Sequence, residues 1–183
     1  LFRRLAGLEG DTRPTEQIWL EISQAPDFVD SRNCGFMDTV QSGWYRNDSD
    51  ELFSGFKVSA SDSVLDFGCG AGGATLFCAH RGAHVVFTDM VAERVESLRL
   101  RVRETRARKA EGFVSGSIPL PLDGGSMTRV IAMEVLEHVP DPVAFLQELT
   151  RIGRPGALYL LTVPGALGEK MQKGLAPDYY FKA

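Results

Sequence analysis

The chain has 183 residues, of which 44% are hydrophobic and 24% are charged, and its formal net charge is −4. This length and composition are those of a globular domain that buries a core of its own. A net charge of −4 excludes the global positive field that duplex nucleic acid or an anionic membrane would attract, so a nucleic-acid partner is disfavoured. The apolar runs are too short for a membrane span. Three cysteines without CxxC spacing indicate reduced thiols in a cytoplasmic protein.

The first sixty residues differ in pattern from the rest of the chain. They predict a helix over residues 15–25, then polar loops that contain Trp44 and Tyr45, and then a short helix near residues 50–55. We interpret residues 1–60 as an N-terminal helical cap and residues 61–183 as the core domain.

From residue 62 onward, short apolar runs alternate with amphipathic stretches, which is typical of a parallel sheet flanked by helices. Asp141 followed by Pro142 favours the start of the last helix. We therefore expect an α/β fold, a Rossmann-like three-layer sandwich with a mostly parallel sheet. The predicted strands are 64–67, 84–88, 112–114, 129–133 and 157–163, and the predicted helices are 73–80, 91–104 and 141–152.

A glycine-rich loop follows the first of these strands. Gly68, Gly70 and Gly73 lie between the strand and the helix that begins at residue 73. Glycines allow a sharp turn and let a ligand approach the backbone, while the amides of the helix N-terminus face that ligand. The loop therefore predicts a nucleotide-like ligand, although the glycines alone do not separate NAD from S-adenosylmethionine.

Two aspartates flank the loop. Asp66 lies two residues before Gly68, at a position that is usually apolar in NAD-binding loops, and it can meet the ammonium end of S-adenosylmethionine, a group that NAD lacks. Asp89 ends the second predicted strand and is suited to accept both ribose hydroxyls of either cofactor. Asp66 therefore favours S-adenosylmethionine.

Residues 64–164 resemble the class I S-adenosylmethionine-dependent methyltransferases, and residues 133–142 resemble their ubiquinone-biosynthesis O-methyltransferase branch. The resemblance implies that residues in the loop hold the methionine part, that Asp89 binds the ribose, and that Met90 packs on the adenine. It also implies that Trp44 to Arg46 close over the methionine end of the cofactor. The cofactor-binding residues that it implies are Arg46, Asp66, Gly68, Gly70, Asp89, Met90 and Met133.

The chain departs from this family after the third predicted strand. Gly116 stands where the family often places an acidic residue against the adenine amino group. We therefore expect the adenine contact to come from the backbone or from Ser117.

Three polar residues follow the fourth predicted strand. Glu134, Glu137 and His138 stand at i, i+3 and i+4, so a helical turn after Met133 would bring them onto one face. Such a group is a partial site for Mg²⁺ or another divalent ion; alternatively, these side chains only form hydrogen bonds. His138, whose ordinary pKa is near neutrality, is the candidate general base, and Glu134 is the reserve.

The family normally ends with an antiparallel pair of strands, and we expect this chain to stop before that pair. The function predicted is S-adenosylmethionine-dependent O-methylation of a small molecule, by a monomer or a homodimer. The alternatives are a 2′-O-methyltransferase of RNA ends, a catalytically silent cofactor-binding module and, last, an NAD-dependent oxidoreductase.

Overall fold

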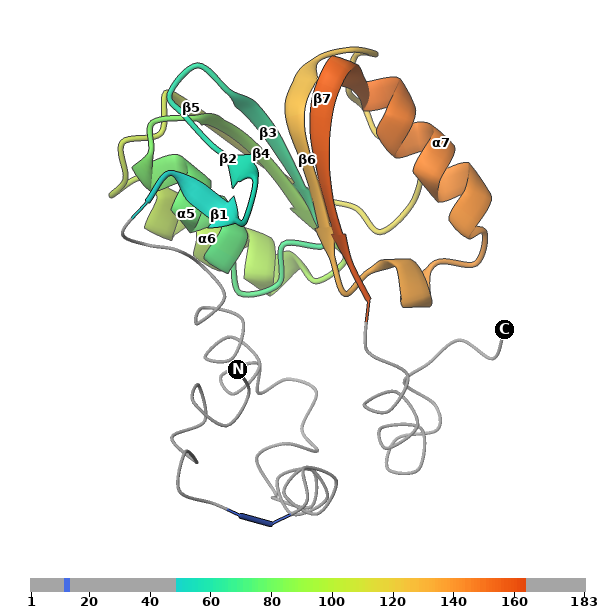
Figure 1. Cartoon of the computed structure of the whole chain (residues 1–183). Coiled ribbons are helices and arrows are strands. Elements are labelled where there is room, and N and C mark those ends of the chain that lie inside the picture. The colour runs from blue at the N-terminus through green and yellow to red at the C-terminus, as the bar shows by residue number, and fades with distance from the viewer. Residues whose placement is uncertain (1–11, 14–48, 164–183) are drawn as a thin grey trace. The chain divides into compact units, whose positions relative to one another are not determined.

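The structure is a computed structural model that describes residues 12–13 and 49–163 (Figure 1). The described residues 49–163 belong to one compact unit of the chain. The helix predicted over residues 15–25, the residues Trp44 to Arg46 and the expected end of the chain lie outside the described residues. The division into a cap and a core domain therefore stays a prediction.

The core of the described unit is a sheet of five strands that all run parallel to one another. Every strand predicted from the sequence is present, and the strand predicted at 112–114 begins earlier, at Lys109. In spatial order the strands are β5 (Lys109–Val114), β4 (His84–Asp89), β3 (Ser63–Phe67), β6 (Met127–Met133) and β7 (Gly153–Thr162).

Three helices connect these strands: α5 (Gly73–His80), α6 (Ala92–Val102) and α7 (Pro142–Ile152). The predicted start of α7 is confirmed, because Oδ1 of Asp141 accepts a hydrogen bond of 2.9 Å from the backbone amide of Ala144. In Figure 1, α5 and α6 lie on one side of the sheet and α7 lies on the other.

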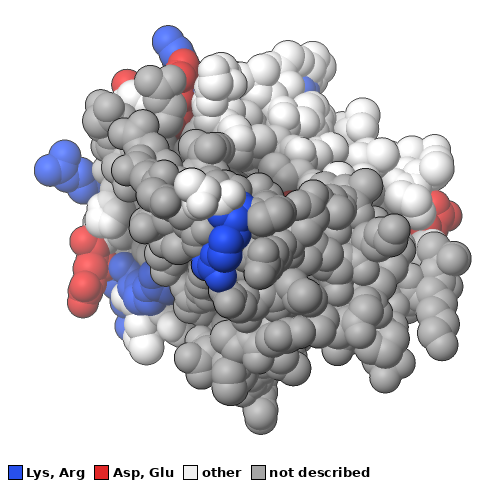
Figure 2. Space-filling view, turned by 60° about the horizontal axis from the view of Figure 1, so that its bottom comes forward, with Lys and Arg blue, Asp and Glu red and all other residues white. Residues whose placement is uncertain are grey.

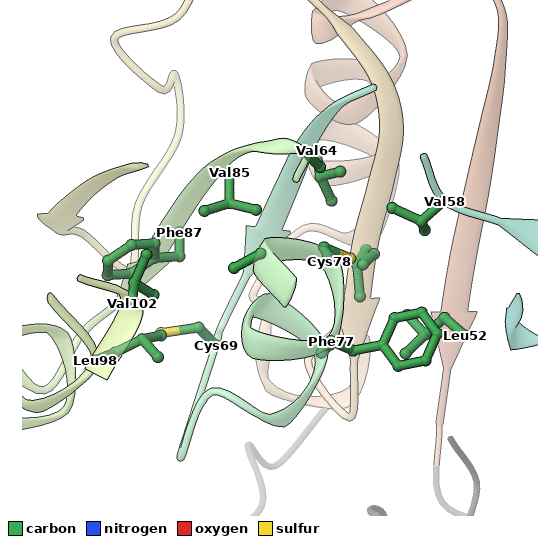
Figure 3. Close-up of a cluster of buried hydrophobic side chains, with 14 of the residues drawn as sticks. Leu52, Val58, Val64, Cys69, Phe77, Cys78, Val85, Phe87, Leu98 and Val102 are labelled. Carbon is green, nitrogen blue, oxygen red and sulfur yellow. The ribbon is translucent and has the colours of Figure 1, made fainter. Parts of the chain in front are cut away.

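Two buried clusters show how the helices cover the sheet. Alternate residues of a strand face opposite sides, so Val64 packs in a cluster with α5 and α6, whereas Leu65 packs in a cluster with α7. Burying an aliphatic or aromatic side chain stabilises a fold by roughly 1.5–3 kcal/mol, so both interfaces contribute strongly. The three-layer sandwich predicted from the sequence is confirmed. The first cluster (Figure 3) includes Val64, Phe77, Cys78, Val85, Phe87, Leu98 and Val102.

The short helix predicted near residues 50–55 is wrong. The chain instead forms an antiparallel hairpin of β1 (Glu51–Phe53) and β2 (Phe56–Lys57), which turns at Gly55 with a φ of 83°. Leu52 and Phe56 are buried in the cluster that contains α5 and α6. The reason lies in packing: the buried side chains of Leu52 and Phe56 come from the two facing strands, which suits a hairpin, and Gly55 makes its turn.

The order of the strands locates a crevice. The chain adds β4 and then β5 on one side of β3, and afterwards returns to add β6 and β7 on the other side. Ligands of open α/β sheets bind outside the carboxyl ends of the strands at such a switch point. Here the glycine loop leaves β3 and the short 3₁₀ helix η1 (Leu136–His138) follows β6 at this edge.

Candidate cofactor site

The glycine loop is attached to the end of β4 by backbone hydrogen bonds. The amides of Gly68 and Cys69 donate to the carbonyl oxygen of Thr88 at 2.8 and 2.9 Å. The next amide, that of Gly70, donates to Oδ2 of Asp89 at 2.9 Å. Gly68 and Gly70 have φ values of 73° and 53°, which glycine adopts at little cost. The loop is therefore held in one conformation by the strand beside it.

The glycines of the loop serve different purposes. A Cβ added at Gly68 would lie 2.6 Å from Cγ2 of Val135, and one added at Gly72 would lie 2.3 Å from Cδ1 of Leu98. These two glycines are required by packing within the protein. A Cβ added at Gly70 would meet no atom of the described residues within 4 Å. Open space above a backbone in this conformation fits the close approach of a ligand that the sequence predicts at Gly70.

Asp66 is buried at the end of β3, where its Oδ2 accepts a hydrogen bond of 2.6 Å from the hydroxyl of Thr75. Burial raises the pKa of Asp66 to about 6, the hydrogen bonds from Thr75 lower it in part, and the charge of Asp89 raises it further. A cation beside Asp66 would stabilise its ionised form. The environment of Asp66 therefore fits the predicted contact with an ammonium group.

The carboxylate of Asp89 accepts hydrogen bonds from two backbone amides, one in the glycine loop and one in the segment that follows β4. In addition to the bond from Gly70, its Oδ1 accepts 2.9 Å from the amide of Val91, and Nη1 of Arg94 lies 3.6 Å from its Oδ2. A carboxylate offers about four acceptor positions, so two backbone donors leave capacity for the ribose hydroxyls that the sequence predicts here. Arg94 is not among the site residues predicted from the sequence, although its place in the first turn of α6 puts it close to the end of β4.

Met90 directly follows Asp89, and its side chain is 76% exposed. A Cβ at Gly116 would lie 3.0 Å from the Cβ of Met90, so the residue that replaces the family's acid abuts the predicted adenine-packing residue. Ser117 lies in an exposed turn, where its amide donates to Oγ of Ser115 at 3.3 Å. The exposed side chain of Met90 beside Gly116 leaves room for a flat ring such as adenine. The contact of Ser117 with the adenine stays a prediction.

The backbone after β6 bends sharply at Glu134. Met133, the last residue of β6, is buried in the core cluster with α5 and α6, and Glu134 has a φ of 56°. The amide of Glu134 donates to the carbonyl oxygen of Thr162 at 3.0 Å, and the hydroxyl of Thr162 donates to Oε1 of Glu134 at 2.8 Å. Burial raises the pKa of Glu134, and the bond from Thr162 lowers it in part. Thr162 is not among the site residues predicted from the sequence; the pairing of the parallel strands β6 and β7 places it beside the end of β6.

The expected convergence of Glu134, Glu137 and His138 is not found. The turn after β6 is the 3₁₀ helix, and the carboxylate of Glu134 is directed to Thr162. Nε2 of His138 lies 3.7 Å from Oε1 of Glu137, which is beyond hydrogen-bond distance. Within residues 49–163, no three His, Cys, Asp or Glu side chains form a group that could hold a metal ion. Burial lowers the pKa of His138, so its ring is neutral at physiological pH.

The described surface carries mixed charge. Lys109 pairs with Glu111 at 2.8 Å, and Arg99 pairs with Glu96. On the face shown in Figure 2, described basic and acidic side chains lie next to one another. None of the helices that the structure describes is both long and apolar enough to cross a membrane. Burial raises the pKa of the thiols of Cys69 and Cys78, so neither is an activated nucleophile.

A parallel sheet with a glycine loop and two carboxylates at its switch point defines a class I, Rossmann-like nucleotide-binding domain. Residues 65–161 match the family described as "Methyltransferase domain". Because this match spans more than half of the chain, the chain belongs to the methyltransferase domain family. The resemblance and the fold expected from the sequence are confirmed.

Curated relatives carry related names. The ubiquinone biosynthesis O-methyltransferase of Xylella fastidiosa (strain M23) is 33% identical over 131 residues, 67% of this chain and 51% of that protein. Methyltransferase GfsG of Streptomyces halstedii is 28% identical over 165 residues, 78% of this chain and 59% of that protein. The chain thus spans about half the length of the ubiquinone-biosynthesis relative.

A solved structure shares the fold. The geranyl diphosphate C-methyltransferase of Streptomyces coelicolor A3(2) has a TM-score of 0.58 at 18% identity. The alignment covers 94% of this chain and 67% of that protein. At this identity the similarity shows the fold.

Proposed function

We propose that the chain binds S-adenosylmethionine and transfers its methyl group to an oxygen atom of a small molecule. The observation that carries this proposal is the open backbone at Gly70, in a loop that follows the buried Asp66 and whose amide donates to the carboxylate of Asp89. Membership of the methyltransferase domain family supports it.

In this proposal each part of the cofactor has its own contacts. The backbone of Gly68 and Gly70 approaches the methionine part, and Asp66 receives its ammonium group. Asp89 accepts the ribose hydroxyls, because backbone donors already orient its carboxylate. The remaining proposed contacts are Met90 and Ser117 at the adenine, Met133 along the crevice and Arg46 at the methionine carboxylate.

Methyl transfer demands little acid–base chemistry from the protein. When bound, S-adenosylmethionine supplies a methyl group already activated on a sulfonium. The residues of the chain then orient the acceptor and remove its proton. His138 is the proposed base because burial keeps its ring neutral and able to accept a proton. Glu134 is the reserve, held by Thr162.

The proposed acceptor is a phenol-like hydroxyl, because relatives at about one-third identity carry names in ubiquinone biosynthesis. The mixed charge of the described surface disfavours an RNA acceptor. We further propose that the protein acts in the cytoplasm, as a monomer or a homodimer, since its buried thiols suit a reducing compartment.

Calorimetric titration with S-adenosylhomocysteine and with NADH, side by side, tests the cofactor. We expect binding of S-adenosylhomocysteine only, and binding of NADH alone would overturn the proposal. Transfer of a labelled methyl group to catechols, compared with RNA oligonucleotides, then tests the acceptor. Binding without transfer to any acceptor would favour the silent cofactor-binding module.

A metal-assisted form of the reaction is a separate proposal. It requires a ligand in addition to Glu134, Glu137 and His138, which by themselves form no metal-binding group in the described part of the chain. It predicts that EDTA abolishes methyl transfer, that Mg²⁺ restores it, and that binding of S-adenosylhomocysteine is unchanged. Full activity in EDTA would exclude it.

A further inference from the structure

An acidic residue of a neighbouring strand lies at the N-terminus of helix α5. Gly72 is the N-cap residue of this helix and contributes no side-chain hydrogen bond, and the first turn contains no acidic residue. The hydroxyl of Thr75, in the first turn, donates instead to the carboxylate of Asp66 in strand β3. A carboxylate at a helix N-terminus is favoured by the unpaired amides and by the helix dipole.

This contact closes the glycine loop. Asp66 precedes the loop and Thr75 follows it, and both side chains are buried, with relative exposures of 4% and 0%. The hydroxyl–carboxylate distance of 2.6 Å is that of a charge-assisted bond. Because a carboxylate has about four acceptor positions, the hydroxyl of Thr75 leaves room for a ligand.

We propose that Thr75 is a positioning residue of the cofactor site, whose hydroxyl orients the Asp66 carboxylate to receive the ammonium end of the cofactor. The inference rests on the proposed function, because it assumes that a ligand with an amino-acid end binds at this loop. It adds a second role for α5: the helix that presents its amides at the crevice also fixes the acidic group beside them.

Among residues 49–163, the other groups that act on Asp66 do not favour its ionised carboxylate. Asp89, at the end of the neighbouring strand β4, opposes ionisation of Asp66 by its negative charge. The thiols of Cys69 in the loop and Cys78 on α5 remain neutral, because burial raises their pKa. The strand partners of Asp66 in the sheet are Phe87 and Ile131, which are apolar. In the part of the chain that the structure describes, the hydroxyl of Thr75 is therefore the contact that favours an ionised, oriented carboxylate.

The test is calorimetric titration of the full chain with S-adenosylhomocysteine between pH 5 and pH 8. The variants are Thr75→Val, Thr75→Ala and Thr75→Ser. Thr75→Val and Thr75→Ala should weaken binding on the order of tenfold at neutral pH, because each removes a hydrogen bond to a charged group. As the pH is lowered, the affinity of these two variants for S-adenosylhomocysteine should also begin to fall at a higher pH than that of the wild type. The reason is that the lost bond favoured the ionised form of Asp66. Thr75→Ser should retain both the affinity and its pH dependence.

Thr128→Val is the matched control. The buried hydroxyl of Thr128 donates to Oδ1 of Asp62 at 2.7 Å, which is the same chemistry at the amino end of the sheet. This variant should lower the thermal stability without changing the affinity for S-adenosylhomocysteine. Thr75→Ala, unlike Thr75→Val, places no γ-methyl group where the hydroxyl faced the carboxylate. It therefore keeps the test available if Thr75→Val does not fold.

The outcomes separate the two proposals. If the wild-type chain does not bind S-adenosylhomocysteine, the proposed function fails. If the wild type binds, but folded Thr75→Ala or Thr75→Val has the same affinity and pH dependence, the role of Thr75 is overturned while the proposed function stands. A loss of affinity in Thr128→Val as large as in Thr75→Ala would also overturn it, because the effect would then follow stability.

Discussion

The backbone amide of Gly70 donates a hydrogen bond of 2.9 Å to the carboxylate of Asp89, across 19 residues of sequence. The predicted ribose-binding acid therefore also shapes the loop that is predicted to hold the methionine part of the cofactor. One residue couples two parts of the site, so a change at Asp89 should affect the whole cofactor and not only its ribose.

Replacing Asp89 tests this coupling. Each carboxylate oxygen of Asp89 accepts a hydrogen bond from a backbone amide. In Asp89→Asn one of these oxygens is replaced by an NH₂ group, a donor, which then faces the amide of Gly70 or of Val91. We expect the affinity for S-adenosylhomocysteine to fall by at least about tenfold, since a bond between a charged and a backbone group is lost. Calorimetry measures the effect, and the exposed Asp123→Asn is the control that should bind normally. Unchanged binding in Asp89→Asn would contradict the coupling.

The buried carboxylate of Asp66 is predicted to lower the stability of the fold in its ionised form while it strengthens the binding of the cofactor. Burial raises its pKa from 3.8 to about 6, so the folded state binds this proton more tightly than the unfolded state does. The penalty for the ionised form is therefore complete above pH 6, about 3 kcal/mol, and vanishes below pH 3.8. Asp66→Asn keeps an acceptor for Thr75 without the charge.

We expect Asp66→Asn to raise the free energy of unfolding at pH 8 and to have little effect near pH 4. Its affinity for S-adenosylhomocysteine should fall, because the ammonium group loses its counter-charge. Urea unfolding at both pH values, without ligand, checks the first part, and calorimetry checks the second. A larger destabilisation at pH 8 than at pH 4 would instead show that the fold favours the ionised carboxylate.

The sequence predicted the sheet and the loop for reasons of period and spacing. Short apolar runs predict strands, and parallel strands place the residues that follow them at a common edge, so Asp66, Gly70 and Asp89 could be grouped without a structure. Thr75 and Thr162 could not, because their hydroxyls bind residues on other elements and no spacing rule marks them.

Two predictions failed because they assumed a helical backbone. Near residues 50–55 the burial of Leu52 and Phe56 favours a hairpin, which turns at Gly55 with a φ of 83°. Glu134, with a φ of 56°, precedes the 3₁₀ turn instead of belonging to it. The i, i+3, i+4 spacing therefore does not bring its carboxylate to the side chains of Glu137 and His138. The sequence marks a positive φ at glycine, but not at glutamate.

The contact between Gly68 and Val135 predicts a coupled pair. Gly68→Ala would place a Cβ 2.6 Å from Cγ2 of Val135, in addition to the strain of a φ of 73°. We expect a loss of stability larger than that of Gly70→Ala, whose Cβ meets none of the described residues. Adding Val135→Ala removes the clash, so the double variant should recover about 1 kcal/mol relative to additive behaviour. Denaturant unfolding of the wild type, the two single variants Gly68→Ala and Val135→Ala, and the double variant measures this coupling. Strict additivity of the two changes in stability would refute the contact.

The strained backbone of Glu134 predicts a difference between two small substitutions. Glu134→Ala and Glu134→Gly both remove the carboxylate that Thr162 binds, so they share that loss. They differ in the cost of a φ of 56°, which an alanine bears and a glycine does not. Glu134→Gly should therefore be more stable than Glu134→Ala by about 1 kcal/mol, as measured by denaturant unfolding.

The same pair of substitutions at Glu96 is the control. Glu96 is exposed within helix α6, where glycine costs about 1 kcal/mol relative to alanine. Glu96→Gly should thus be less stable than Glu96→Ala, which is the opposite order. A reversal of sign between the two sites would arise only from the left-handed backbone at Glu134, because the chemical change is identical. If glycine is the less stable residue at both sites, the strain at Glu134 does not exist, and Thr162 would then hold an ordinary strand end.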